Sequence, residues 1–384
     1  MKITFDSAAM SRQLAVASRA LSNKPITPIL GCYLFEVDED GTHVAITARD
    51  IENTLSVICP IVTFEPDGDA SKRRLCIPSR IIMSALKEIP AQPVTLTVNM
   101  QTMEIRGDYA NGHFAIVGEH ADEYPVPPTV AGDAARLTMP SSTLLSNLNA
   151  TLYATADDEL RPVMTGIFFD LTPERMVCVG TDGKILVRST TAATLPGLSL
   201  PDGAFGFILP KKSASILCAL LTKDDSAIAL RFTDKQLRVE SDAFVLTARL
   251  VDGRYPNYNA VISKKSSYTA DVDRDALMAA TRRVSVFSSM SSCLMKLQFA
   301  SGQLIVSAQD VDYATSGQEA MPAGWNGPDG FTIGVNGDML QALIRHIGSD
   351  IRMALSDPTR AILIAPADSP EHTDILMLIM PMVL

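Results

Sequence analysis

A weak internal repeat that fills the chain is the feature that most constrains its fold. Segments 44–50, 176–182 and 304–310 each contain alternating apolar residues and then end in an aspartate. These aspartates, Asp50, Asp182 and Asp310, are 132 and 128 residues apart, and 384 divided by three is 128. Self-similarity at one period indicates a chain built from copies of one structural unit. We therefore expect three similar domains, at residues 1–130, 135–263 and 264–384.

The segments around the aspartates keep the same period. Strand-like runs at 29–37, 163–171 and 294–300 precede the aspartate segments, and a strand leading into a helix follows each of them. Apolar residues at helical spacing predict two helices in each repeat, at 7–21, 79–89, 141–155, 211–222, 275–287 and 337–347. The remaining segments alternate with a period of two, which is typical of antiparallel sheet. The expected fold class is α+β, with linkers at 124–134 and 263–267.

Composition excludes several classes of protein. Hydrophobic residues make up 47% of the chain and charged residues 20%, which excludes wholesale disorder. The longest apolar run, 375–384, is interrupted by Pro381 and is too short to cross a bilayer, and no signal segment opens the chain. We expect a cytoplasmic protein with no membrane partner. The six cysteines lie far apart without a Cys-x-x-Cys pair, so buried free thiols are expected rather than disulfides or a zinc site.

Charge is distributed unevenly between the predicted helices and the rest of the chain. A formal net charge of −10 argues against a protein that holds nucleic acid by electrostatics alone. The predicted helices, however, carry nine basic and three acidic residues, a sum of +6, whereas everything else sums to 24 minus 40, or −16. Either helix surfaces simply hold lysine and arginine, or the helices face a polyanion. In the second case they would contact phosphates without reading sequence.

Catalytic and metal-binding patterns are weak. Asp50, Asp182 and Asp310 recur without a recurring partner, so a turn role is expected for them. The five histidines show no metal-ligand spacing, and no cofactor is expected. Ser84 and Lys87 match the Ser-x-x-Lys of acylating serine enzymes, but the companion motifs are missing. A serine–lysine hydrolase and a peptide-binding scaffold without a DNA role therefore stay open as alternatives.

Five short motifs, in order along the whole chain, carry a family resemblance. They are Met1-Lys2-Ile3-Thr4, Pro25-Ile26-Thr27-Pro28-Ile29-Leu30, Thr181-Asp182-Gly183, Leu250-Val251-Asp252-Gly253-Arg254-Tyr255-Pro256 and Met380-Pro381-Met382-Val383-Leu384. With the three-fold repeat, they make the sequence resemble the bacterial DNA sliding clamp family, the beta subunit of DNA polymerase III. The resemblance implies a non-catalytic processivity factor, in which three clamp domains per chain place antiparallel sheets outside and two helices per domain around the hole of a ring.

The resemblance also implies partners and residue roles. The partners are duplex DNA bound without sequence preference, a second copy in a head-to-tail homodimer, the replicative polymerase, a clamp loader and other proteins with clamp-binding peptides. The partner-peptide pocket would comprise Met164, Thr181, Gly183, Leu186, Pro256, Val261, Leu378, Met380, Pro381, Met382 and Leu384. The DNA-facing residues would be Arg12, Arg19, Lys24, Arg80, Lys87, Lys211, Lys212, Arg282, Arg283 and Arg345. The dimer seam would place Phe114 and Ile116 of one copy against Val286 and Phe287 of the other.

The chain departs from the family pattern on the rim of that pocket. Lys184 and Ile185 stand where the family commonly has His-Arg, and Ala260 and Val383 stand where basic residues are common. We expect the apolar pocket to be retained and the preferred peptide to differ in detail.

Overall fold

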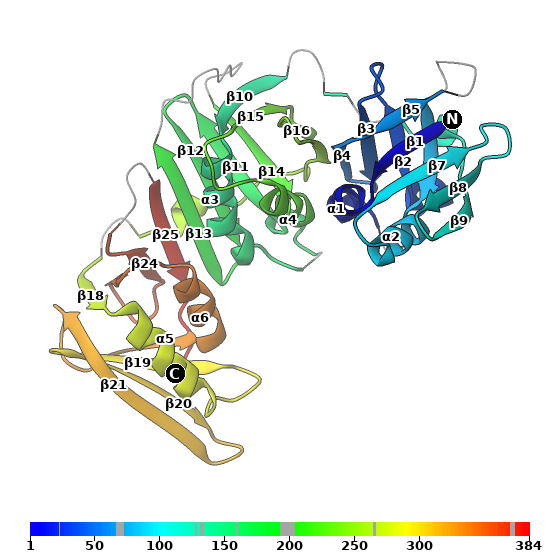
Figure 1. The fold of residues 1–384 in the computed structure, drawn as a ribbon. Coiled ribbons are helices and arrows are strands. Elements are labelled where there is room, and N and C mark those ends of the chain that lie inside the picture. The colour runs from blue at the N-terminus through cyan, green and yellow to red at the C-terminus, as the bar shows by residue number, and fades with distance from the viewer. Residues whose placement is uncertain are drawn as a thin grey trace. The chain divides into compact units, whose positions relative to one another are not determined.

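The computed structural model describes residues 1–22, 24–66, 73–126, 129–130, 134–158, 160–192, 204–263, 266–368 and 373–384. These residues form two compact units (Figure 1). The first unit contains 1–142 and 215–250, and the second contains 143–192, 204–214 and 251–384, within the described ranges. The two units are described separately below.

The described helices and strands follow one order three times, with an additional short strand, β5, in the first repeat; three-ten turns are written as η. The first repeat contains β1 (Lys2–Asp6), α1 (Ser7–Ala17), η1 (Ser18–Ala20), η2 (Pro28–Gly31), β2 (Cys32–Val37), β3 (His43–Arg49), β4 (Asn53–Pro60), β5 (Thr63–Glu65), β6 (Arg74–Pro78), α2 (Ser79–Glu88), β7 (Pro93–Val98), β8 (Glu104–Tyr109), β9 (Gly112–Val117) and η3 (Ala121–Glu123). The second contains β10 (Ala135–Pro140), α3 (Ser141–Thr151), η4 (Leu152–Ala154), η5 (Pro162–Met164), β11 (Gly166–Thr172), β12 (Arg175–Thr181), β13 (Ile185–Ala192), β14 (Phe205–Pro210), α4 (Lys211–Leu220), β15 (Ala227–Phe232), β16 (Gln236–Glu240), β17 (Phe244–Arg249) and η6 (Tyr258–Ala260). The third contains β18 (Tyr268–Val272), α5 (Arg274–Ser285), β19 (Leu294–Ala300), β20 (Gln303–Asp310), β21 (Thr315–Trp325), β22 (Phe331–Asn336), α6 (Gly337–Arg345), β23 (Ile351–Leu355), β24 (Ile362–Pro366) and β25 (Thr373–Ile379).

Antiparallel sheets run from one repeat into the next. In the first unit, β5-β1-β7-β8-β9 form one sheet and β10-β15-β16-β17-β4-β3-β2-β6 form another. In the second unit the order is β14-β11-β12-β13-β25-β24-β23-β18-β21-β20-β19-β22. Two strand pairs therefore connect successive repeats: β4 with β17, which we call the first joint, and β13 with β25, which we call the second joint. The predicted α+β class with antiparallel sheets is confirmed.

The three repeated aspartates end equivalent strands and close equivalent turns. One carboxylate oxygen of Asp50 accepts the backbone N–H groups of Glu52 and Asn53, at 2.9 and 2.6 Å. Asp182 and Asp310 make the same pair of bonds to the N–H groups two and three residues ahead, at 2.7 and 2.7 Å and at 3.0 and 3.3 Å. An aspartate that bonds its own following backbone is a standard turn device. The predicted turn role is confirmed in all three repeats.

The six predicted helices are present, and all six end earlier than predicted. Asp6 caps α1, because its carboxylate accepts the N–H of Ala9 at 2.8 Å. The helix predicted to reach residue 21 changes at Ser18 to the three-ten turn η1, and α3 changes to η4 in the same way. Helix ends commonly tighten into such turns. In α2 the side chain of Ile81, one of the apolar residues of the predicted helix 79–89, is 52% exposed.

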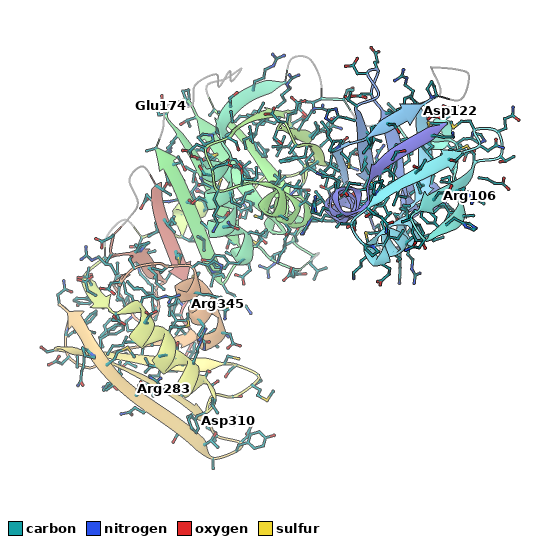
Figure 2. All side chains as sticks on the ribbon, in the orientation of Figure 1. Arg106, Asp122, Glu174, Arg283, Asp310 and Arg345 are labelled. Carbon is teal, nitrogen blue, oxygen red and sulfur yellow. The ribbon has the colours of Figure 1, made fainter. Side chains whose placement is uncertain are left out.

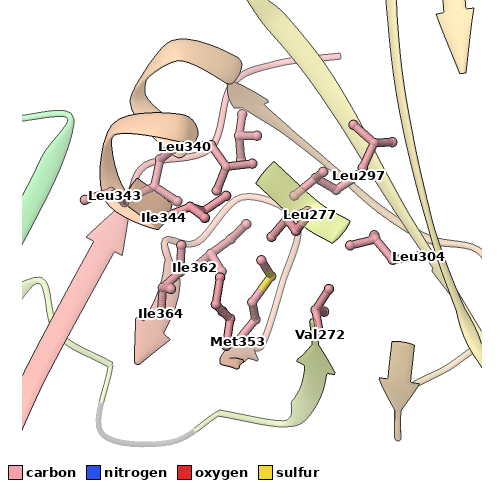
Figure 3. Close-up of a cluster of buried hydrophobic side chains, with 14 of the residues drawn as sticks. Val272, Leu277, Leu297, Leu304, Leu340, Leu343, Ile344, Met353, Ile362 and Ile364 are labelled. Carbon is pink, nitrogen blue, oxygen red and sulfur yellow. The ribbon is translucent and has the colours of Figure 1, made fainter. Parts of the chain in front are cut away.

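The second unit has a large core built from the sheets and helices of the third repeat. Figure 3 shows Leu277 of α5 and Leu340 of α6 among strand residues that include Leu297 and Met353, and all of these are fully buried. The single tryptophan, Trp325, packs beside this core, with its ring centroid 4.7 Å from that of Phe299. Its indole N–H donates to the carbonyl of Pro328 at 3.1 Å. The strands and helices of this repeat are thus held by continuous apolar contact.

The cysteines are free thiols, as predicted. Cys32, Cys59, Cys76 and Cys178 are buried, and burial raises the pKa of each thiol. Cys218 and Cys293 were also expected to be buried but are partly exposed. The thiolate is the reactive form, so the four buried thiols are poor nucleophiles.

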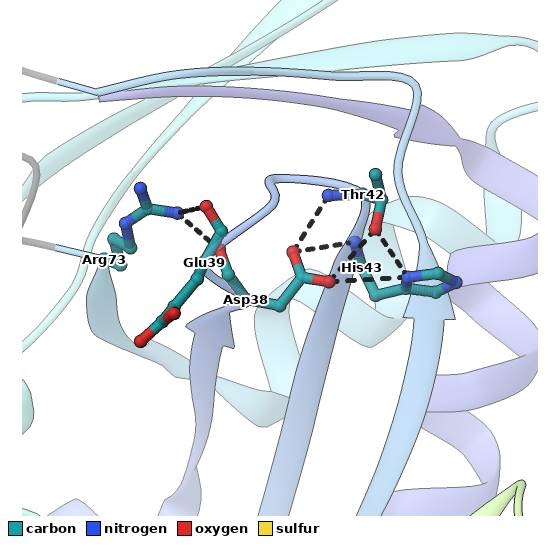
Figure 4. A network of polar contacts seen from close by, with 5 residues as sticks. All are labelled: Asp38, Glu39, Thr42, His43 and Arg73. Carbon is teal, nitrogen blue, oxygen red and sulfur yellow. Dashed lines mark hydrogen bonds and ion pairs between the residues drawn. The ribbon is translucent and has the colours of Figure 1, made fainter.

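The turn between β2 and β3 is held by a polar network around Asp38 (Figure 4). Its carboxylate accepts the backbone N–H groups of Thr42 and His43, at 2.8 and 3.1 Å, and the hydroxyl of Thr42 at 3.1 Å. The Arg73 guanidinium donates to the carbonyls of Asp38 and Glu39 and lies over the ring of Phe64. Partial desolvation alone would raise the pKa of Asp38, but the hydrogen bonds outweigh it and the pKa is lowered.

Candidate functional site

Eight of the eleven residues predicted for the peptide pocket line one cavity in the second unit. Its volume is about 110 Å³. The eight residues come from η5, the end of β12, the following turn, β13, the segment after β17, and β25 with the residue that follows it: Met164, Thr181, Gly183, Leu186, Pro256, Val261, Leu378 and Met380. The family resemblance had implied these positions, which lie in four segments far apart along the chain. The cavity is mostly apolar, as small-ligand and peptide sites usually are.

A tight turn shapes one wall of this cavity. The hydroxyl of Thr181 donates to the carbonyl of Ile185 at 2.6 Å and accepts the N–H of Gly183 at 3.1 Å. Gly183 has a φ of +88°, where a side chain would be strained, and a Cβ there would lie 3.0 Å from the guanidinium of Arg161. Asp182 and Thr181 together therefore hold the backbone of this turn by hydrogen bonds.

The floor of the cavity is aromatic. The ring of Tyr255 stacks on that of Phe168 with centroids 4.7 Å apart, and its hydroxyl donates to the carbonyl of Val179 at 3.3 Å. The hydroxyl of Tyr258 donates to a carboxylate oxygen of Asp170 at 2.7 Å. Burial, together with the bond to Asp170, raises the pKa of Tyr258 to about 12. The phenols therefore stay neutral, and the floor presents apolar ring surface.

Several lining residues were missing from the prediction. Lys184 and Ile185 had been noted only as departures on the rim, and both line the cavity. Tyr255, Asn257 and Tyr258 line it as well. The recurring Tyr-Pro pair at the end of the first two repeats was a signal that could have identified Tyr255.

The last five residues leave the cavity and join another part of the second unit. The N–H of Met380 donates to the carbonyl of Lys184 at 2.8 Å, beside the cavity. The N–H of Met382 donates to the carbonyl of Gly334 in β22 at 2.8 Å. A Cβ at Gly334 would lie 3.0 Å from Leu384, so that side chain also lies over β22. Pro381, Met382 and Leu384 are not among the residues that line the cavity, and their role in binding stays a prediction.

The residues predicted to face DNA lie on or beside helices. Arg12, Arg80, Lys87, Lys211, Lys212, Arg282, Arg283 and Arg345 are on α1, α2, α4, α5 and α6, Arg19 is in η1, and Lys24 precedes η2. Figure 2 shows Arg283 and Arg345 on α5 and α6. Helix α5 begins one residue earlier than predicted and so includes a further basic residue, Arg274.

Arg283 and Lys211, both from this set, are paired with carboxylates. The guanidinium of Arg283 donates to both carboxylate oxygens of Glu319 in β21, at 2.5 and 2.8 Å. This bond raises the pKa of Arg283 and lowers that of Glu319. The ammonium of Lys211 lies 2.6 Å from a carboxylate oxygen of Asp157. Neither partner was visible in the helix pattern, because each lies on a different element.

The predicted seam residues lie on the edge strand β9 and in the segment directly after α5. Phe114 and Ile116 belong to β9, which ends its sheet, and both are half-buried. Val286 and Phe287 follow α5 directly and are 77% and 39% exposed. Each phenylalanine covers a strand glycine: a Cβ at Gly107 would lie 2.1 Å from the Phe114 ring, and one at Gly317 would lie 2.4 Å from the Phe287 ring.

The described residues contain no group of three or more His, Cys, Asp or Glu side chains that could hold a metal ion. Ser84 and Lys87, the weak hydrolase motif, are both exposed on α2. In the same described ranges, no helix has the length and apolar character needed to span a membrane.

Comparison with known proteins places the chain in a class. Three family models match it in succession: the N-terminal domain of the DNA polymerase III beta subunit over residues 1–128, the central domain over 138–257 and the C-terminal domain over 259–383. Together these models cover nearly the whole chain. The chain belongs to the DNA polymerase III beta subunit family.

Individual relatives agree with this assignment. The beta sliding clamp of Synechocystis sp. is 27% identical over 402 residues, with 98% of each chain covered. The beta sliding clamp of Escherichia coli K12 is 24% identical over 382 residues, with 98% of this chain and 99% of that one covered. Among solved structures, the DNA polymerase III subunit beta of Pseudomonas aeruginosa matches with a TM-score of 0.90 at 23% identity, and the whole of both chains is covered. The Bacillus subtilis sliding clamp matches with a TM-score of 0.89 at 20% identity, covering 100% of this chain and 99% of that one.

Proposed function

We propose that two copies of this chain form a closed ring that encircles duplex DNA and tethers the replicative polymerase. The observation that carries this proposal is the strand pairing between successive repeats. The strand after the aspartate turn of one repeat, β4 or β13, pairs with the last strand of the next repeat, β17 or β25. β21 is the strand after the aspartate turn of the third repeat, and β9 is the last strand of the first repeat. Among the described strands, neither has a partner of this kind within the chain.

Both leftover strands have open edges that can pair with another chain. In the described residues β9 pairs only with β8, and β21 pairs on its second side only with β18, over Ala323–Trp325. Unpaired strand edges are templates for pairing. A contact between unlike surfaces generates a ring when the rotation closes. We therefore propose that β9 of one copy pairs beside β21 of the other, with Phe114 and Ile116 meeting Val286 and Phe287 at both seams of a head-to-tail homodimer.

The remaining roles follow from this arrangement. The ten basic residues on and beside the helices would face the DNA and contact phosphates weakly enough to permit sliding. The cavity around Met164 and Leu378 would receive the apolar residues of short peptides from the polymerase, the clamp loader and other partners. The chain would act in the cytoplasm without catalysis of its own, and its domains would span residues 1–130, 135–263 and 264–384.

Topological retention is tested on circular DNA. The protein, with its clamp loader, is loaded onto nicked circular duplex DNA, and the DNA is then cut once. A ring slides off the new ends, so the DNA-bound fraction should fall to background after cutting and stay constant without cutting. A protein that binds the surface of DNA would remain bound after cutting, which would contradict the proposal.

The seam is tested by placing a charge on it. Phe114→Asp and Phe287→Asp should each give monomers by light scattering at micromolar concentration, because the carboxylate must lose its water when the seam closes. Val117→Asp is a matched control on the same strand, since Val117 is 63% exposed and alternates with the half-buried Phe114 and Ile116. Dimers that persist in both seam variants would place the interface elsewhere.

The peptide role is tested at the cavity itself. Met164→Asp introduces a carboxylate into an apolar wall and should weaken binding of the replicative polymerase by at least tenfold, measured by surface plasmon resonance. The dimer should be unchanged, because no seam residue is altered. Polymerase binding that survives this substitution would move the tethering site to another surface.

A further inference from the structure

The first unit contains a second, larger cavity, and Lys24 is the one residue of its lining that the proposed function uses. Its volume is about 160 Å³, and its apolar lining includes Ile26, Leu30 and Ile51. Ile26 and Ile51 are 74% and 59% exposed, so two large apolar side chains stand at its mouth. For scale, an apolar cavity of about 150 Å³ can hold a benzene molecule. One phenyl or isobutyl group would therefore fit.

This cavity is built from the same two elements as the peptide cavity of the second unit. One is a three-ten turn that begins with proline, η2 or η5, and the equivalent lining residues Leu30 and Met164 are 134 positions apart. The other is the aspartate turn, in which Glu52 and Lys184 are equivalent and 132 positions apart. The repeat has thus produced two cavities with one architecture.

The charge of the two linings is opposite. In the second unit Lys184 is the charged residue of the lining, which gives +1. In the first unit Lys24 contributes +1 and Asp50 and Glu52 contribute −2, which gives −1. The sign is reversed at the equivalent turn position, where Glu52 replaces a lysine. A lining with a net negative charge favours a cationic group beside the apolar group.

We propose that the cavity around Leu30 and Ile51 is a second peptide-docking site, which takes a bulky apolar residue followed by a basic residue from an extended segment of a partner protein. The apolar side chain packs on Leu30 and Ile51, and the basic side chain lies beside Glu52. The inference goes beyond the tethering role proposed above and does not require a closed ring.

Two fluorescein-labelled heptapeptides test the proposal with the full-length chain. Both have a central phenylalanine in a Gly/Ser background, one followed by lysine and the other by glutamate, and binding is measured by fluorescence anisotropy. Ile51→Asp should weaken binding of the phenylalanine–lysine peptide at least tenfold, and Ile26→Asp should do so as a second variant at an exposed position. Met164→Asp, in the other cavity, should leave this peptide's affinity unchanged.

A charge exchange identifies the site more sharply. Glu52→Lys should reverse the preference, so that the phenylalanine–glutamate peptide binds more tightly to the first-unit cavity. Glu104→Lys, on the exposed strand β8, changes the net charge equally and should leave the preference as it was.

The remaining outcomes decide against the proposal. Equal peptide affinity in the parent chain and in both isoleucine variants, with unchanged circular dichroism, would overturn it. Loss of short-duplex binding in these variants, without peptide binding by the parent, would make the cavity a DNA contact. DNA retention on circles is scored on the same variants, so failure of this inference is separate from failure of the ring.

Discussion

The two joints between repeats use one backbone rule with different side chains. At the first joint, five residue pairs connect β4 and β17, and apolar residues such as Leu55 and Leu246 lie opposite each other. At the second joint, seven pairs connect β13 and β25. The second joint adds an ion pair between Arg188 and Asp374, at 2.9 Å.

A contact between two rings is a further difference between the two joints. Tyr153 in η4 stacks on His346 at the end of α6, with ring centroids 3.7 Å apart, and so connects the second repeat to the third. The equivalent turn of the first repeat, η1, is 134 positions earlier and has Arg19 where η4 has Tyr153. The comparison shows that strand pairing defines where repeats meet, whereas side chains unique to each repeat set how firmly they are held.

The largest effect is expected from truncating a buried apolar side chain at each joint. This pair of variants tests whether the two joints are equally well packed. Leu246→Ala at the first joint and Met377→Ala at the second each remove a side chain that is no more than 1% exposed. Each should lower the free energy of unfolding by about 2–5 kcal/mol. Urea denaturation followed by circular dichroism measures both. A much smaller loss for Leu246→Ala would show that the first joint is loosely packed.

A smaller effect is expected from the stacked rings. Tyr153→Leu keeps apolar bulk but removes the stacking on His346, and should cost about 0.5–1.5 kcal/mol. Tyr153→Phe is the matched control: it keeps the ring and removes only a hydroxyl that lies 3.7 Å from the sulfur of Met377. Equal losses in the two variants would mean that the hydroxyl, not the ring, connects the repeats.

The ion pair of the second joint should matter less again. Asp374→Asn leaves Arg188 without its charged partner, and the Asp374 side chain is 60% exposed. The Arg188 side chain is 23% exposed, so the pair is partly exposed, and ion pairs at the surface contribute about 0–1 kcal/mol. Thermal melts at 20 mM and 500 mM salt measure the difference, which should shrink at high salt because exposed charges are screened. A loss above 2 kcal/mol that is independent of salt would contradict this ranking.

The smallest effects are expected from two aspartates, each in a turn of the sheet that contains one of the joints. Hydrogen bonds lower the pKa of Asp38 between β2 and β3, against partial desolvation, and hydrogen bonds from Thr359 lower that of Asp357 between β23 and β24. Their contribution to stability is therefore present above about pH 4, the usual carboxyl pKa, and is lost as the pH falls through the lowered pKa.

Asp38→Asn and Asp357→Asn should therefore melt slightly lower than the parent chain at pH 7. The difference should disappear as the pH is lowered below 4. Melting temperatures between pH 2 and pH 7 measure this, with Glu104→Gln on β8 as an exposed control. A difference that grows on acidification would contradict the assigned sign.

Local features of the sequence were sufficient to predict the repeats and many elements. Asp50, Asp182 and Asp310 could be assigned to turns because an aspartate bonds to its own following backbone, which is a local interaction. The start of α1 after Asp6 was predictable for the same reason. The end of α1 was not, because the change to η1 depends on packing against β3 and β4.

Contacts between elements far apart in the chain could not be predicted from the sequence pattern. The pairing of β4 with β17 joins segments nearly 200 residues apart, and no periodicity states which strands meet across repeats. The bond from Arg283 to Glu319 likewise depends on how α5 packs on β21. Eight pocket residues were predicted because the resemblance supplied long-range information. The course of Met382 and Leu384 along β22 was not predicted, because it depends on backbone pairing between Met382 and Gly334.

The position of Trp325 makes it an intrinsic fluorescence probe of one region of the molecule. Because this single indole packs against Phe299 beside the core of the third repeat, its emission reports melting of that region and leaves the first unit unobserved. Far-ultraviolet ellipticity, in contrast, averages over every helix and strand. Denaturation curves from the two signals will coincide if the units unfold cooperatively and will separate if either unit opens by itself.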